Sequence, residues 1–342
     1  MLISNNNYAR NCDFVFAETV DYQTFESLNK DSLDIIYKNA HEITYKSKIL
    51  NISDGDTIYC KTDYLRELFY LIKKTKVKNL NLVTHQSDVS ISSNSLNKLP
   101  ENFSNWFTIN KNLSSNKVIS IPIGLAGNFS KKNLHAKDFN ENRVPSFDLK
   151  NKEQKIYINF NKNTNSYERN KALNILKNYH NAFISDANLT KDKYKEDLSK
   201  YAFVLCPWGN GFDTHRIWET LYSGSIPITK DHYSFEYLEK LPVIIIKDYE
   251  DLYNLDLKNY IEKFNVDSFN LKKLYLNYWI SKINENKTHI HDRKENNIII
   301  SRNVSIYFKT LIYSKNKFES YKKKILYYLK KAVFKATNLY RN

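Results

Sequence analysis

The chain has few residues of the kinds that interrupt or cross-link a fold: six glycines, six prolines and three cysteines in 342 residues. Cys12, Cys60 and Cys206 are far apart and form no CxxC or CxxH motif, which argues against a disulfide framework and a cysteine-based zinc site. The sequence also lacks a run of about 18 apolar residues and the apolar core of a signal peptide. We therefore expect a cytoplasmic protein.

The composition is that of a folded protein. Hydrophobic residues make up 42% of the chain and aromatic residues 14%, which excludes a largely disordered chain. The length suits two domains of ordinary size. The net charge of +15 is compatible with binding to nucleic acid, an anionic membrane or an acidic substrate. Lys, Asn, Ile and Tyr are all abundant, so a biased genome composition explains the charge equally well.

Strand and helix patterns alternate along the chain, which predicts an α/β fold with mostly parallel sheets. We expect strands at 13–17, 31–38, 57–60, 81–83, 103–110, 118–123, 155–160, 183–185, 202–206, 225–228 and 243–246. We expect helices at 22–28, 64–74, 167–177 and 191–200, between Asp213 and Gly224, and from residue 248 onward. The polar segment 131–153 is the best candidate for a linker, which predicts domains at 1–150 and 151–285 and a helical, basic tail at 286–342.

The segment 201–228 has the clearest chemical pattern, because a strand, a glycine loop and a short helix follow one another. Asp213 is in position to cap the helix, whose free N–H groups and dipole attract phosphate. The polar side chains beside this expected anion site are His215, Arg216 and Glu219. The loop is neither a dinucleotide fingerprint, since Thr214 stands where GxGxxG needs glycine, nor a Walker loop.

Two further segments place polar side chains after expected strands. His85 and Asp88 follow the strand at 81–83, where either side chain would be positioned to act as a general base. The alternative is that Ser87 and Asp88 only cap a turn. Arg169 lies near the start of an expected helix and adds a second cation suited to an anion, although an ordinary solvated helix face would look the same.

The C-terminal segment 315–335 carries eight lysines and one acidic residue, Glu319. Ile325, Leu329 and Val333 fall on one face at helical spacing, so the segment is predicted to be a basic amphipathic helix. Such a helix can bind an anionic membrane surface or pack on the protein with its lysines in water. Both interpretations stay open.

The segment 201–228 resembles the C-terminal domain motif of exostosin-like glycosyltransferases and related viral and bacterial enzymes. Weaker similarity covers Ile121–Leu125, which resembles the IPxG segment that ends their N-terminal domain, and 155–169, which resembles the opening of their second domain. Trp208 departs from the pattern, since many members carry a basic residue there. The residues that carry the main resemblance are Phe203-Val204-Leu205-Cys206-Pro207, Gly209-Asn210-Gly211, Asp213, His215-Arg216, Trp218-Glu219, Leu221, Gly224 and Ile226-Pro227-Ile228.

The resemblance implies a GT-B fold, in which two Rossmann-like domains, one for the acceptor and one for the nucleotide-sugar donor, face each other, with C-terminal helices added. It implies that the loop 209–211 and Arg216 bind the donor diphosphate, with Arg169 adding charge, and that Glu219 accepts hydrogen bonds from the ribose. The other expected donor-binding residues in this loop and helix start are Gly209, Asn210, Gly211, Asp213 and His215. Asp88 becomes the expected base, with His85 next.

The implied function is transfer of a sugar from a nucleotide sugar to a glycan acceptor in surface-glycan synthesis, with possible attachment to the inner membrane surface through 315–335. GT-B enzymes typically need no metal or other cofactor, because cationic side chains and helix dipoles stabilise the leaving diphosphate. Asp54-Gly55-Asp56 has the DxD form that binds a divalent ion in another class of sugar transferase, but its position favours a hairpin turn. The alternatives are a basic nucleic-acid-binding protein, for which no recognition motif is present, and a non-catalytic membrane-surface scaffold.

Overall fold

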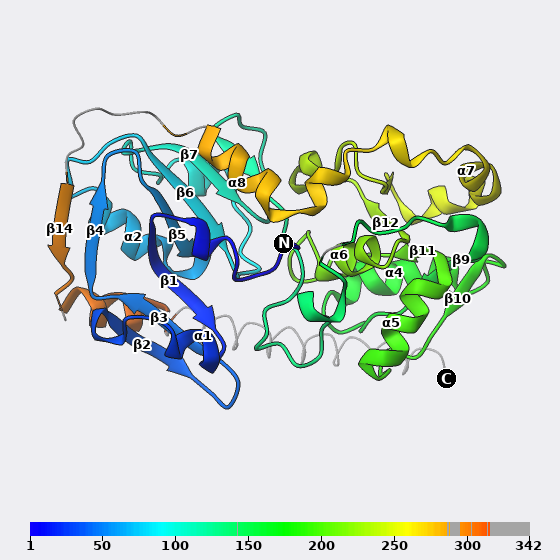
Figure 1. Ribbon diagram of the computed structural model, residues 1–342, viewed down its shortest axis with the longest axis horizontal. Coiled ribbons are helices and arrows are strands. Elements are labelled where there is room, and N and C mark those ends of the chain that lie inside the picture. The colour runs from blue at the N-terminus through cyan, green and yellow to red at the C-terminus, as the bar shows by residue number, and fades with distance from the viewer. Residues whose placement is uncertain (142, 286, 288–294, 302, 313, 315–342) are drawn as a thin grey trace, which may run out of the picture.

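The computed structural model describes residues 1–141, 143–285, 287, 295–301, 303–312 and 314. The basic segment 315–335 lies outside these residues. Figure 1 shows two groups of strands side by side, with the N-terminus between them. One group contains a seven-stranded sheet and a two-stranded sheet of β4 and β14, and the other a five-stranded sheet, with helices beside them, so the α/β class predicted from the sequence is confirmed.

The first sheet has seven strands in the order β2-β3-β1-β5-β6-β7-β8. The five strands from β1 to β8 in this order run parallel, and β3 and β2 extend the β1 edge in antiparallel pairings. The parallel strands end on the side where the polar loops 85–88 and 109–112 follow. The strand bounds are β1 (Phe14–Val20), β2 (Leu33–Lys38), β3 (Ile43–Ser47), β5 (Thr57–Lys61), β6 (Leu80–His85), β7 (Phe103–Thr108) and β8 (Val118–Ser120).

The second sheet has five strands, all parallel, in the order β10-β9-β11-β12-β13. In chain order this is 2-1-3-4-5, a doubly wound arrangement whose direction of winding changes between β9 and β11. Every residue of β11 is buried, as expected for a central parallel strand covered on both faces. The bounds are β9 (Glu153–Ile158), β10 (Ala182–Ile184), β11 (Tyr201–Leu205), β12 (Ile226–Lys230) and β13 (Ile244–Ile246).

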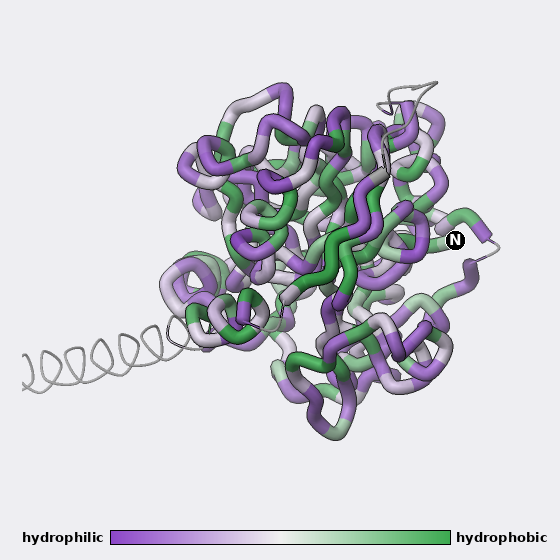
Figure 2. Tube along the Cα trace, turned by 90° about the vertical axis from the view of Figure 1, so that its left-hand side faces the viewer, coloured by the Kyte–Doolittle hydropathy of each residue, from purple (hydrophilic) through white to green (hydrophobic). Residues whose placement is uncertain are grey.

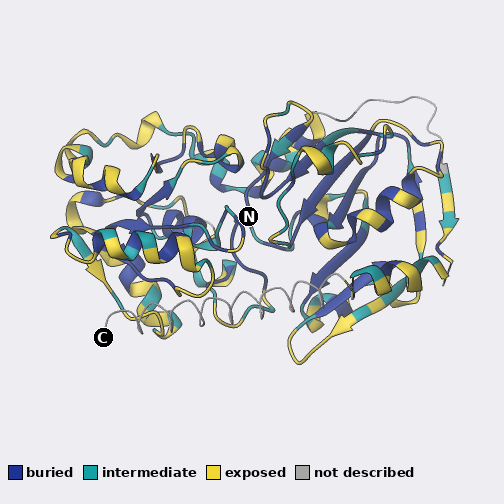
Figure 3. Cartoon of the chain, turned by 180° about the vertical axis from the view of Figure 1, so that it is seen from behind, coloured by how far each residue is buried: buried dark blue, intermediate teal, exposed yellow. Residues whose placement is uncertain are grey.

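The helices pack against the sheets with their apolar faces, and the polar faces of the helices are exposed to solvent. Figure 3 shows the central strands of both sheets as buried and many outer helix and loop residues as exposed. In Figure 2 the strands near the centre of the view are largely apolar and the loops around them largely polar. The bounds are α1 (Tyr22–Glu26), α2 (Leu65–Ile72), α3 (Ser93–Leu96), α4 (Ser166–Leu176), α5 (Lys191–Lys200), α6 (His215–Tyr222), α7 (Leu257–Lys263), α8 (Leu276–Glu285) and a helix at 303–312.

Two predictions about local structure are wrong. Asp54-Gly55-Asp56 is a turn but not a hairpin, because β4 (Ile49–Ser53) pairs with β14 (Glu295–Ile299) while β5 pairs with β1 and β6. The segment 295–299, expected in a helical tail, is instead the strand β14. Its backbone pairs with that of β4, which lies far away in the sequence. The predicted domain boundaries stay predictions.

The segment 131–153, which joins the two sheets, packs against the end of α6. Gly224 ends α6 with φ +67°, and a Cβ there would lie 2.0 Å from the carbonyl oxygen of Ser146. Only glycine fits such a close approach in the left-handed region. Lys152 Nζ also donates a hydrogen bond to the carbonyl oxygen of Ser223, 2.9 Å away. The segment is thus held on the second sheet.

Candidate functional site

The candidate site lies where the winding of the second sheet changes direction. Ligands of open parallel sheets bind at such a point, outside the carboxyl ends of the strands. The loop after β9 and the loop after β11 meet here, and Arg169 of α4 joins them. Its Nε donates to the carbonyl oxygen of Trp208 at 3.1 Å, and its Nη1 donates to that of Asn161 at 2.8 Å. Asn165 Nδ2 donates to the carbonyl oxygen of Gly209 at 3.0 Å, which closes the contact between the two loops.

Arg169 and Arg216, which we call the arginine pair, bring two positive charges to this point. Burial, and secondly the charge of Arg216, lower the pKa of Arg169 to about 10. Within the described part of the chain, no carboxylate oxygen lies within 4.0 Å of either guanidinium group. The neighbouring acid, Glu168, is instead paired with Lys230 at 2.9 Å. The arginine pair therefore has no direct ion pair with a described carboxylate, and the nearby Glu219 carboxylate acts on Arg216 without contacting its guanidinium group.

Arg216 is the second residue of α6 and is connected to Glu219 through Tyr194 of α5. Arg216 Nη1 donates to the Tyr194 hydroxyl at 3.0 Å, and that hydroxyl donates to Glu219 Oε2 at 2.8 Å. The Arg216 guanidinium also lies 5.3 Å from the centre of the Tyr194 ring. Glu219 is 3% exposed, and its Oε1 accepts the backbone N–H of Leu134 at 3.3 Å. The ribose contact expected of Glu219 stays a prediction, and it would use lone pairs of a carboxylate that already has two donors.

The start of α6 has hydrogen-bonding groups that make no capping bond to a side chain. Its N-cap is Thr214, whose side chain makes no capping hydrogen bond. The Thr214 hydroxyl is buried and has no partner among the residues that the structure describes. A Cβ at Gly209 would lie 3.3 Å from Arg169 Nη2 and 3.6 Å from the Thr214 methyl group, so these groups surround the loop glycine. Arg169 and the N-cap residue Thr214, whose hydroxyl has no described partner, thus lie beside Gly209.

Several contacts join this loop to the carboxyl edge of the first sheet. Asn110, directly after β7, donates from Nδ2 to the carbonyl oxygen of Ser87 at 3.1 Å. Its Oδ1 accepts the backbone N–H groups of Phe212 at 2.8 Å and Asp213 at 3.4 Å. A Cβ at Gly211 would lie 2.7 Å from both polar atoms of this amide, so the loop needs glycine to come this close. The carboxyl edges of the two sheets therefore face each other.

His215 and Asp213 also form hydrogen bonds between the start of α6 and the loop after β8. His215 Nδ1 donates to the carbonyl oxygen of Gly124 at 2.7 Å. Asp213 Oδ2 accepts the backbone N–H of Ile123 at 2.8 Å, and burial raises the pKa of this carboxyl to about 7. The prediction that Asp213 caps α6 is wrong, because Thr214 is the N-cap and the Asp213 carboxylate bonds to the loop after β8. A donor-binding role for His215 or Asp213 stays a prediction.

The two candidate bases differ sharply in their surroundings. His85, at the end of β6, is 0% exposed, and its ring nitrogens contact Asn5 Oδ1 at 2.9 Å and the Pro122 carbonyl oxygen at 3.2 Å. Burial lowers the pKa of His85 to about 3. Both ring nitrogens have partners in the protein and the ring is closed to solvent, which disfavours His85 as a base, and its assignment as the second candidate stays a prediction. Asp88 is exposed in the loop that Asn110 holds through Ser87, and its role as base stays a prediction.

Sequence patterns did not reveal Asn110, Tyr194, Asn161 or Asn165. Asn110 has φ +55°, a conformation that asparagine tolerates better than most residues, and an asparagine at the end of the strand expected at 103–110 is the signal that could have pointed to it. Tyr194 gave no such signal, because it is one of 26 tyrosines in the chain. Sequence patterns did single out Asn210, which is exposed in the structure, and Trp208. In the structure Lys230 Nζ lies 4.8 Å from the centre of the Trp208 ring. The structure thus supplies a cation beside the tryptophan.

Comparison with known proteins gives one distant structural similarity to report. No protein family and no curated protein matches the sequence. Among solved structures the chain is similar to one described as "Crystal structure of GtfA/B complex", at 9% sequence identity and a TM-score of 0.36. The match covers 69% of this chain and 58% of the chain in that structure. It therefore spans less than two thirds of the length of the chain in that structure. At this distance the similarity assigns neither an activity nor a ligand.

No helix in the described ranges is long and apolar enough to cross a membrane. Across the same ranges, no three His, Cys, Asp or Glu side chains come together as a metal site. Asp54 and Asp56 have structural contacts: Asp54 Oδ1 accepts the backbone N–H of Lys78 at 2.6 Å, and Asp56 Oδ2 that of Ser53 at 2.7 Å.

Proposed function

We propose that the protein is a glycosyltransferase that moves a sugar from a nucleotide sugar to a glycan hydroxyl. The observation that carries the proposal is the arginine pair, two guanidinium groups that no described carboxylate contacts directly, at the change of winding of a parallel sheet. A diphosphate would bring negative charge into direct contact with them, and guanidinium groups bind phosphate oxygens through paired N–H donors. The sequence resemblance supplies the sugar part of the proposal.

The groups of the site fit the charges of sugar transfer. Negative charge develops on the leaving diphosphate, where Arg169 Nη2, Arg216 and the free N–H groups at the start of α6 are available to bind it. These donors are fixed before the reaction, because carbonyl oxygens hold Arg169 and Tyr194 holds Arg216. Two guanidinium groups take the place that a metal ion has in other transferases. The proposed reaction is therefore metal-independent.

The acceptor would bind on the first sheet, opposite the donor. The two parallel sheets face each other at their carboxyl edges, which supports a two-domain GT-B arrangement. Asp88 follows β6 on this edge, and Asn110 connects its loop to the backbone of Phe212. An exposed carboxylate in this position is suited to remove the proton of an attacking hydroxyl if the reaction inverts the anomeric configuration. We propose that Asp88 is this base.

The direct test is nucleotide binding by the arginine variants. Titration calorimetry with UDP, GDP, ADP and CMP should identify a nucleotide that the wild-type chain binds. Arg216→Gln and Arg169→Gln each remove one charge-assisted hydrogen-bond donor, which should weaken binding of that nucleotide by about 10- to 100-fold. Arg143→Gln, at an exposed arginine of the segment 131–153, removes the same charge and should leave affinity unchanged. Equal affinity in all three variants would contradict the proposed donor site.

Sugar transfer is tested separately, because nucleotide binding alone is not catalysis. Wild-type protein with the identified nucleotide sugar should release the nucleotide slowly by hydrolysis, and faster when a suitable glycan acceptor is added. Hydrolysis that disappears in Arg216→Gln at saturating donor would place the reaction at this site. Tight nucleotide binding without any hydrolysis or transfer would favour the non-catalytic scaffold instead.

A further inference from the structure

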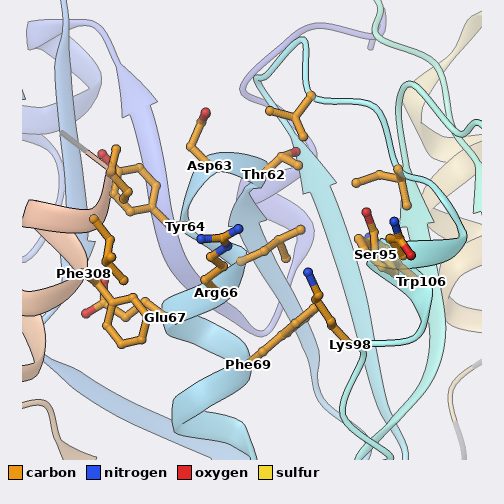
Figure 4. A pocket seen from close by; sticks show the side chains of 16 residues that line it. Thr62, Asp63, Tyr64, Arg66, Glu67, Phe69, Ser95, Lys98, Trp106 and Phe308 are labelled. Atoms are coloured by element: carbon orange, nitrogen blue, oxygen red, sulfur yellow. The ribbon is translucent and has the colours of Figure 1, made fainter. Parts of the chain in front are cut away.

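A cavity lies on the first sheet, and neither arginine of the arginine pair lines it. It has a volume of about 200 Å³ and is enclosed by α2, the segment 89–98 and the helix 303–312. Figure 4 shows this pocket, with Phe308 on one side and Trp106 on the other. Its floor and walls are largely apolar, and the side chains that form them include Phe69, Val89, Ile91, Trp106, Phe308 and Leu311.

Two cations stand at this cavity without acidic partners. Arg66 of α2 and Lys98 are both exposed, and they lie between Thr62 and Phe69 in the view of Figure 4. No carboxylate of the described chain lies within 4.0 Å of either cation. The two acidic residues that line the cavity are already neutralised.

The acidic side chains have lysine partners from elsewhere in the first sheet. Asp63 Oδ2 lies 3.5 Å from Lys61 Nζ. Glu67 forms an ion pair with Lys46, and the side chains of these two residues are almost completely buried. The local balance around the cavity therefore leaves the positive charges of Arg66 and Lys98 in excess. An apolar cavity with an excess of positive charge beside it favours a ligand that is apolar at one end and anionic at the other.

We propose that this cavity binds an anionic amphiphile, an alkyl chain that carries a phosphate headgroup. The chain would enter between Phe69 and Phe308, and Arg66 and Lys98 would bind the headgroup through charge-assisted hydrogen bonds. The volume is adequate for part of such a chain, since an engineered apolar cavity of about 150 Å³ holds a benzene molecule. This site is separate from the proposed donor site and does not depend on the proposed reaction.

The neighbouring sequence favours this occupant over the protein's own C-terminal segment. The lysine-rich segment 315–335 begins three residues after Ile312, which lines the cavity. Its eight lysines would be repelled by Arg66 and Lys98 if it occupied the site. A polybasic segment and a cationic cavity mouth are instead attracted to the same negative charge. Both features therefore point to an anionic lipid rather than to an internal contact.

The test uses the full chain and dodecyl phosphate below its micelle concentration, titrated by calorimetry. Wild-type protein should bind it, and Arg66→Gln combined with Lys98→Gln should weaken binding by about 10-fold or more. Lys177→Gln combined with Lys272→Gln removes the same charge from exposed lysines of the other half and is the matched control. Val89→Trp fills the apolar part without changing charge and should also weaken binding, while its thermal unfolding temperature shows whether it is folded.

Each outcome supports or overturns the proposal. Weaker binding in both the charge variant and folded Val89→Trp, with the control unchanged, supports a single amphiphile site. Competition by equimolar inorganic phosphate would show that only the headgroup is bound, which overturns the apolar part of the proposal. Unchanged affinity in the charge variant, or no binding by the wild type, overturns it entirely. If Val89→Trp is unfolded, Leu311→Phe provides the smaller apolar change and the same comparison.

Discussion

The contact between Gly211 and Asn110 gives the sharpest test of the junction between the sheets. In Gly211→Ala the new Cβ would lie 2.7 Å from both Nδ2 and Oδ1 of Asn110 and 3.0 Å from its Cγ. The amide cannot easily move aside, because it bonds to Ser87, Phe212 and Asp213. Gly209→Ala is the matched control, since its closest contact would be 3.3 Å, to the end of the Arg169 side chain.

The expected magnitudes follow from two opposing effects. Neither glycine has a positive φ, so alanine is allowed and its lower freedom in the unfolded chain stabilises by about 0.4–1 kcal/mol. Overpacking against a fixed group costs about 1–3 kcal/mol. Gly211→Ala should therefore lower the free energy of unfolding by about 1–2 kcal/mol. Gly209→Ala should leave it unchanged or raise it by up to about 1 kcal/mol.

Urea unfolding followed by circular dichroism measures both variants, and a double-mutant cycle identifies the cause. In an Asn110→Ala background the clashing amide is absent, so Gly211→Ala should no longer destabilise. The backbone strain of alanine at position 110 is present in both corners of the cycle and cancels. The same loss in both backgrounds, or a loss no larger than that of Gly209→Ala, would refute the proposed junction.

Three further predictions concern single residues. Burial raises the pKa of Asp213 from 3.8 to about 7, so the folded state holds this proton more tightly and stability falls as pH rises between about 4 and 7. The side chain of Asp213→Asn does not titrate, so the stability of this variant relative to wild type should grow across that window by at most about 4 kcal/mol. Urea unfolding at several pH values measures this difference, and parallel pH profiles of the two proteins would contradict the prediction. Tyr194→Phe removes the hydroxyl between Arg216 and Glu219 but keeps the ring, so calorimetry should show a smaller loss of nucleotide affinity than in Arg216→Gln; an equal or larger loss would argue against a direct role of Arg216. Asp88→Asn should slow transfer by about 10²- to 10⁴-fold with unchanged donor affinity, and unchanged turnover would move the base elsewhere.

Local patterns predicted most elements of the second sheet. The predicted helix 191–200 has the bounds of α5, and the expected strand and helix on either side of Gly209 are β11 and α6. Apolar runs and helical spacing suffice there, because each element is buried by its immediate neighbours in the chain. The strands β4 and β14 were missed or misassigned for the opposite reason: each is defined by a partner more than 240 residues away.

The sequence alone predicted an anion site from a glycine loop that leads into a helix with Arg216 near its start. The chemistry of these residue types and their local spacing are sufficient for that conclusion. Folding then determined which charges meet: the strand order brings Arg169 beside Arg216, while Glu168 pairs with Lys230 and forms no ion pair with either arginine. It also enclosed His85, left Asp88 exposed and placed Asn110 against Gly211. These outcomes depend on pairings between distant segments, whose energies no local pattern contains.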